Sequence, residues 1–118
     1  LAKLYLPKNR ISDITPLAGL TDLNKLVLTG NRIADLAPLT GLPELARLYL
    51  PQNQISDLTP LAKLTKLKTL NLRDNRIKDV TPLRELNELE TLWLTGNPLH
   101  EDQKAMLKKA LPGCRIEF

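Results

Sequence analysis

Few side chains in this sequence belong to the types that carry out catalysis, and they do not form a recognisable constellation. The chain has one histidine, His100, which is followed directly by Glu101 and Asp102. A single imidazole with neighbouring carboxylates lacks the spacing of a metal site, so we interpret it as a solvated surface residue. Cys114 is the one cysteine, which excludes an internal disulfide in these residues. We expect its thiol to point inward from a short final strand as a small apolar group.

The remaining candidates for chemistry also favour structural roles. Ser12 and Ser56 have no histidine in a repeating relation to them, and the glycines are too isolated to form a phosphate-binding loop. An aspartate recurs once in each repeat, at Asp13, Asp35, Asp57 and Asp79. One carboxylate per repeat does not supply the six or more oxygens that calcium prefers, so we expect these aspartates to cap turns. We therefore predict no enzyme, no cofactor and no metal site.

An internal repeat determines the elements that must position any functional side chain. Asparagine recurs every 22 residues, at Asn9, Asn31, Asn53, Asn75 and Asn97. Aligned on these asparagines, the chain divides into units that begin at Leu1, Leu23, Leu45, Leu67 and Leu89. Each complete unit has the pattern LxxLxLxxNxIxD(I/L/V)x-P-L-xx-L, and such a period is typical of solenoid architectures. We expect one domain over residues 1–118.

Each column of the repeat has a physical interpretation. The LxxLxL stretch alternates apolar and variable residues, which indicates a short strand with one buried face. The asparagine amide can both donate and accept, so five asparagines in register predict a buried ladder that joins adjacent coils. Pro at the start of the next segment favours a short helical turn, and we expect the preceding Thr hydroxyl to cap that turn.

Stacking is required because one such unit cannot bury its own leucines, whereas neighbouring units can. The stretches at residues 9–20 and 31–42, with equivalents at 53–64 and 75–86, match N-x-I-x-D-I-x-P-L-x-x-L, with small variations. The sequence therefore resembles leucine-rich repeat proteins of the internalin type. The resemblance implies an α/β fold: a right-handed, curved solenoid with a parallel β-sheet on the concave side and short helical turns on the convex side.

The two ends of the chain differ from the repeating units. After Asn97, the residues Met106, Leu107, Ala110 and Leu111 have helical spacing, and Cys114, Ile116 and Phe118 alternate as in a strand. We interpret residues 99–118 as a helical C-terminal cap, similar to those of many bacterial leucine-rich repeat proteins. No N-terminal cap precedes Leu1, so we expect the first repeat either to pair with a second copy or to continue a longer chain.

Side chains that point outward from the predicted strands form the candidate binding surface. The central column holds Tyr5, Val27, Tyr49, Asn71 and Trp93, so three of the four aromatic residues lie outside the core. The column before it begins Lys3, Lys25 and Arg47, and the column after it includes Arg73. Exposed aromatic residues are typical of interaction hot spots. The alternative is a solvated face on which tyrosine is simply a good strand residue.

These patterns leave three hypotheses for function. The first, which the resemblance also implies, is a non-catalytic module that binds a protein partner, with an acidic segment, through the concave face. The second is an engineered, excised or designed repeat scaffold without a natural ligand, self-associating through its first repeat. The third, nucleic-acid binding, is disfavoured because the net charge is only +4. Membrane insertion is not expected, because no stretch approaches the roughly 18 apolar residues of a spanning helix.

Overall fold

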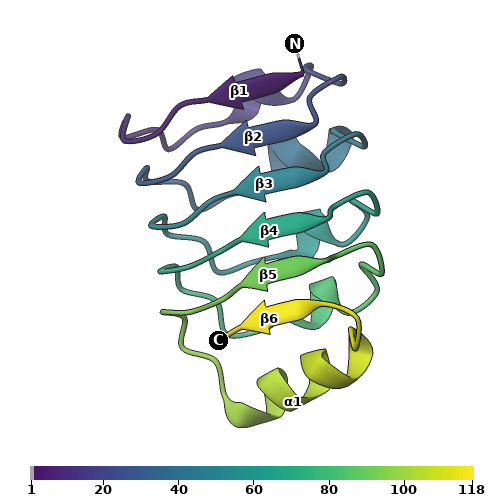
Figure 1. Ribbon diagram of the computed structural model, residues 1–118. Coiled ribbons are helices and arrows are strands. Elements are labelled where there is room, and N and C mark those ends of the chain that lie inside the picture. Colours follow the sequence, from purple (N-terminus) through teal and green to yellow (C-terminus); the bar gives the residue numbers. More distant parts are fainter. Residues whose placement is uncertain (1) are drawn as a thin grey trace.

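The computed structural model of the protein describes residues 2–118 and contains one parallel β-sheet of six strands, in the spatial order β1-β2-β3-β4-β5-β6 (Figure 1). Leu1, where the first unit is expected to begin, lies outside the described residues. The strands are three residues each: β1 Lys3–Tyr5, β2 Lys25–Val27, β3 Arg47–Tyr49, β4 Thr69–Asn71, β5 Thr91–Trp93 and β6 Arg115–Glu117. From β1 to β5 the register advances by one repeat per strand, as the period predicts.

Short 3₁₀ turns lie behind the sheet and complete each coil, giving the curved solenoid expected from the sequence (Figure 1). They span η1 Thr15–Leu17, η2 Ala37–Gly41, η3 Thr59–Leu61 and η4 Thr81–Leu83. The expected threonine cap is wrong: Thr59 is the first residue inside η3, and the cap position before it is occupied by Leu58, whose side chain makes no capping hydrogen bond. Instead, Asp57 Oδ1 accepts a hydrogen bond from the Thr59 backbone N–H at 2.9 Å. The repeated aspartate is therefore the turn-forming residue.

The repeated asparagines connect consecutive coils through their side-chain amides. Asn53 is 8% exposed; its Nδ2 donates to Leu28 O and Leu50 O, and its Oδ1 accepts from Ile33 N. Asn31 and Asn75 are buried in the same way. Asn97 is half-buried, and Asn9, contrary to the expected buried ladder, is exposed. The reason is that β1 is an edge strand, so no coil within residues 2–118 covers the outer side of Asn9.

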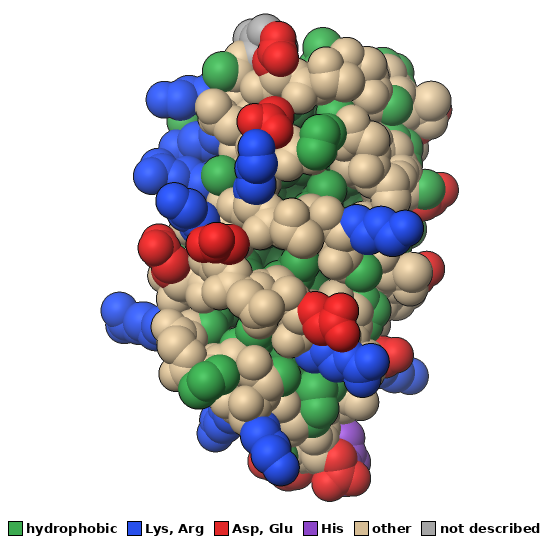
Figure 2. Space-filling view, turned by 90° about the vertical axis from the view of Figure 1, so that its right-hand side faces the viewer, with side chains coloured by type: hydrophobic (Ala, Val, Ile, Leu, Met, Phe, Trp, Pro, Cys, Tyr) green, Lys and Arg blue, Asp and Glu red, His purple; other side chains and the backbone are tan. Residues whose placement is uncertain are grey.

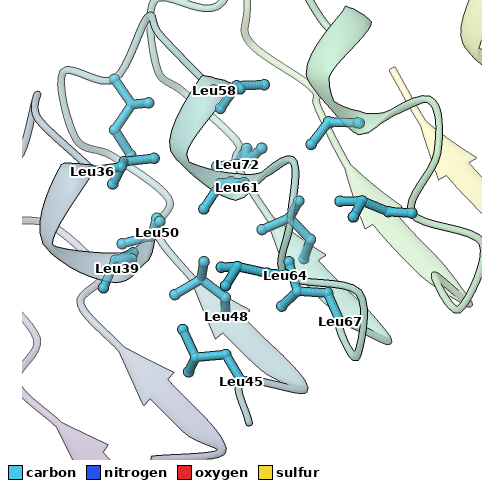
Figure 3. Packing of buried hydrophobic residues seen from close by; sticks show 14 of the residues in the cluster. Leu36, Leu39, Leu45, Leu48, Leu50, Leu58, Leu61, Leu64, Leu67 and Leu72 are labelled. Carbon is cyan, nitrogen blue, oxygen red and sulfur yellow. The ribbon is translucent and has the colours of Figure 1, made fainter. Parts of the chain in front are cut away.

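The core consists almost entirely of leucine and isoleucine in vertical columns. Leu48 and Leu50 point inward from the third coil and meet Leu61 and Leu64 from its turn (Figure 3). Each of these four side chains is at most 1% exposed. Burial of a leucine side chain contributes roughly 1.5–3 kcal/mol, so the stacked columns supply the main driving force for folding.

The C-terminal segment covers the last coil. Helix α1, Glu101–Ala110, lies beneath β6 and η4 (Figure 1). Leu107 and Leu111 are buried against the core, and the Gln103 side chain accepts a hydrogen bond from Val80 N at 2.8 Å. Acidic residues in the first turn and lysines in the last turn of α1 stabilise the helix, because their charges interact favourably with its dipole. Ile116 then pairs in register with Leu92, so β6 extends the sheet by one strand.

Candidate binding surface

The side of the sheet that faces away from the 3₁₀ turns, here called the strand face, carries the outward side chains in two ordered rows. Strand pairing aligns Lys3, Lys25 and Arg47 in one row. The neighbouring row runs Tyr5, Val27, Tyr49, Asn71, Trp93 and Glu117. Tyr5 is 53% exposed and is the large apolar side chain most open to solvent among the described residues; Tyr49 and Trp93 are half-buried. The structure thus places the aromatic residues on one face, as the alternation predicts.

Lys25 organises the first three strands of this face. Its Nζ lies 5.1 Å from the centroid of the Tyr5 ring and 5.8 Å from that of the Tyr49 ring. Val27 lies between the two tyrosines in the row. Hydrogen bonding to Lys25, together with its charge, holds the pKa of the Tyr5 phenol below its ordinary value. The ammonium group is therefore held in place by cation–π attraction.

Arg73 contacts residues of the last two strands of the strand face, β5 and β6. Its guanidinium carbon lies 5.4 Å from the centroid of the Trp93 ring, and its Nη2 is 3.1 Å from Glu117 Oε2. Arg115 Nη2 lies 3.6 Å from the other oxygen of Glu117. Sequence reasoning did not include Arg115 or Glu117 in the candidate site. The signal was nevertheless available, because Cys114, Ile116 and Phe118 alternate inward and thereby place the residues between them outward.

A shallow hollow lies where the first strands begin, with a volume of about 350 Å³. Four of its six lining residues are cationic, and the full set is Lys3, Asn24, Lys25, Ala46, Arg47 and Lys68. Figure 2 shows Lys and Arg side chains gathered at the upper left margin, where the strand face meets this side of the molecule. We call the hollow lined by these six residues, Lys3 to Lys68, the basic hollow. None of its four cations forms an ion pair within residues 2–118.

Other candidate residues occupy structural positions. His100 precedes α1, and its Nδ1 accepts a hydrogen bond from Asp102 N at 3.3 Å, so the exposed imidazole caps the helix. Cys114 is half-buried rather than fully inward, and burial raises the pKa of its thiol. No three potential metal-ligating side chains lie together in the described part of the chain. Within it, no helix has the length and apolar character needed to cross a membrane.

The repeat geometry is matched by a known family. A family profile described as "Leucine Rich repeats (2 copies)" matches residues 1–41, 43–85 and 65–104. The chain belongs to the leucine-rich repeat family. No match was found among curated proteins.

Solved structures show the same leucine-rich repeat solenoid and identify the internalin type. Internalin C2 of Listeria monocytogenes is 43% identical with a TM-score of 0.81, over 86% of this chain and 45% of that one. Internalin F of the same organism is 38% identical with a TM-score of 0.87, over 98% and 33% of the two chains. A Leptospira interrogans leucine-rich repeat protein is 27% identical with a TM-score of 0.74, over 100% and 37%. The chain therefore spans less than half the length of each of these structures.

Proposed function

We propose that this leucine-rich repeat chain is a non-catalytic protein-recognition module that binds its partner through the strand face. The observation that carries the proposal is the alignment of Tyr5, Tyr49 and Trp93 on one solvent-facing side of the sheet. Leucine-rich repeat proteins generally act as protein-interaction modules, and internalins are the type that this chain resembles.

The physical properties of the strand face support this use. Aromatic residues and arginine dominate binding hot spots because they bury large areas at low entropic cost. Here Lys25 and Arg73 lie against the aromatic rings, so both are partly ordered before a partner arrives. Pre-organised side chains lose less conformational entropy on binding. Because each strand is rigidly paired with its neighbours, the aromatic side chains are also held in fixed relative positions.

The hollows on the surface fit a protein partner better than a small molecule. Small-molecule sites are usually concave, largely apolar cavities that bury most of the ligand. One surface hollow, of about 620 Å³, is open and is lined mainly by polar and charged residues such as Glu44, Lys66, Lys68 and Glu85. An extended partner segment laid across the strands needs no enclosed cavity. The cations Lys3, Lys25 and Arg47, on β1, β2 and β3, favour a partner that carries acidic groups there.

A peptide-display selection with the purified chain as bait tests the proposal. We expect the enriched peptides to bind the wild type and to lose at least about tenfold in affinity for the Tyr49→Ala/Trp93→Ala variant, since two hot-spot truncations usually cost well over 1 kcal/mol. The control, Ser56→Ala/Lys63→Ala, changes exposed residues away from the strand face and should bind normally. Circular dichroism checks that both variants remain folded. Peptides that bind all three proteins equally would contradict the proposal.

A further inference from the structure

The strand face has a back half, around β4 to β6, whose cations form ion pairs with Glu117, and a front half, around β1 to β3, whose cations form no ion pair among residues 2–118. At the back, both Arg73 and Arg115 form ion pairs with Glu117, and Arg73 also covers Trp93. At the front, no carboxylate among residues 2–118 pairs with any cation of the basic hollow. An incoming carboxylate therefore has to displace an internal partner at the back but has free cations at the front.

The front cations are also held close to one another. Lys3, Lys25 and Arg47 are directly opposite one another in the strand register, and neighbouring strands lie about 4.8 Å apart. Like charges directly opposite on adjacent strands are destabilising, so this row carries a repulsion that a bound anion would relieve. Lys68 adds a fourth cation at the margin of the hollow.

Lys25 is the central residue of the cluster. Its neighbours in the row lie on either side, while its Nζ rests over the rings of Tyr5 and Tyr49. Unlike the exposed Lys3 and Arg47, Lys25 is half-buried. A cation that is already ordered by two rings binds an anion with a smaller entropic loss than a free surface lysine.

We propose that the basic hollow is the subsite that binds clustered carboxylates of an extended acidic segment in the partner protein. An apolar residue of that segment then lies on the tyrosines beside Lys25. The occupant is argued from charge complementarity, because four unpaired cations adjoin an aromatic surface. This inference rests on the proposed function and specifies which partner chemistry the strand face recognises.

The probe is a labelled synthetic peptide with a run of glutamates around a central leucine, and the readout is fluorescence anisotropy. The test variant is Lys3→Gln/Lys25→Gln/Arg47→Gln, which changes the net charge from +4 to 4 − 3 = +1. We expect it to bind at least about tenfold more weakly, since three surface charge contacts of roughly 0.5 kcal/mol each combine to that factor. Lys25→Met keeps an apolar side chain of similar length, and we expect it alone to weaken binding about twofold.

A charge-matched control separates the subsite from general electrostatic attraction. Arg10→Gln/Arg32→Gln/Arg76→Gln also removes three positive charges, but from an exposed row outside the strand face. We expect this variant to lose less than about twofold in affinity for the peptide. Equal losses in the two triple variants would overturn the proposal, and so would a glutamine version of the peptide that binds as well as the glutamate version. No binding to the wild type would also overturn it. A single-stranded oligonucleotide that binds more tightly, with the same loss in the test variant, would assign the hollow to nucleic acid instead.

The outcomes also separate this inference from the proposed function. If the display-selected peptides are neutral and still need Tyr49 and Trp93, the strand face is the binding surface and the acidic subsite is wrong. If those peptides do not use the strand face, the proposed function fails whatever the glutamate peptide does.

Discussion

Replacing Asn53 with alanine tests how the coils are held together. Its Oδ1 is the acceptor for the buried Ile33 N–H at 3.0 Å, and its Nδ2 donates to Leu28 O at 3.0 Å and Leu50 O at 3.2 Å. Each of these two carbonyls also accepts from another asparagine of the ladder. The substitution therefore leaves the Ile33 N–H without its acceptor and takes one hydrogen bond from each of these two carbonyls and one from Pro51 O, to which Nδ2 also donates at 3.2 Å.

The expected loss of stability in Asn53→Ala follows from these lost hydrogen bonds. An unsatisfied buried donor costs about 1–3 kcal/mol and each lost hydrogen bond about 0.5–1.5 kcal/mol, so we expect Asn53→Ala to lower the free energy of unfolding by at least about 2 kcal/mol. Asn9→Ala is the matched control. The Asn9 side chain is exposed and, among residues 2–118, donates only to Pro7 O, so its loss should cost less than about 1 kcal/mol.

Urea unfolding followed by circular dichroism measures both costs, with the slope against urea expected to be unchanged. Amide hydrogen exchange adds a local readout, because the Ile33 N–H should lose protection in Asn53→Ala. Equal destabilisation by the two substitutions would refute the reasoning, since the ladder would then not connect the buried coils. Retained protection at Ile33 would refute it independently.

Two further predictions concern the turns. Gly96 has a φ of +83°, and a Cβ there would overlap the Asp74 carboxylate; Gly96→Ala should therefore lower the free energy of unfolding by about 1–3 kcal/mol in urea titrations. Gly19→Ala, where an added Cβ meets nothing, should be close to neutral, and equal effects would contradict the explanation. Hydrogen bonds from the Thr59 side chain and backbone N–H lower the pKa of Asp57. The ionised Asp57 carboxylate therefore stabilises the fold above the unfolded pKa of about 3.9, and this stabilisation is lost as the pH falls through the lower folded pKa. Asp57→Asn should consequently reduce the loss of stability between pH 7 and pH 3 in urea titrations, and an unchanged pH dependence would count against it.

The repeating part of the fold could be predicted because each column has one physical role. Leu48 must be buried and Tyr49 must point outward once the strand alternation is recognised, and Asn53 falls where the chain leaves the strand and an amide can connect two coils. The period fixes the register between those strands. The expectation that Asn9 is buried was wrong, because a ladder residue in an edge coil has a neighbouring coil on one side only within residues 2–118.

Contacts that depend on side-chain conformation or on the cap could not be predicted in the same way. The step from Trp93 to its neighbour Glu117 is 117 − 93 = 24 residues rather than 22, because helix α1 interrupts the repeat. The ion pair between Arg73 and Glu117 therefore has no counterpart in the sequence period. The position of Lys25 over two rings depends on rotamers, which a pattern of residue types does not specify.

Amide chemical-shift mapping with a display-selected peptide shows which side of the sheet contacts the partner. We expect the largest shifts on residues of β1 to β5, with concurrent quenching of Trp93, the one tryptophan of the chain. Shifts concentrated instead on the 3₁₀ turns or on helix α1, with unchanged Trp93 fluorescence, would contradict the assignment of the strand face as the binding surface.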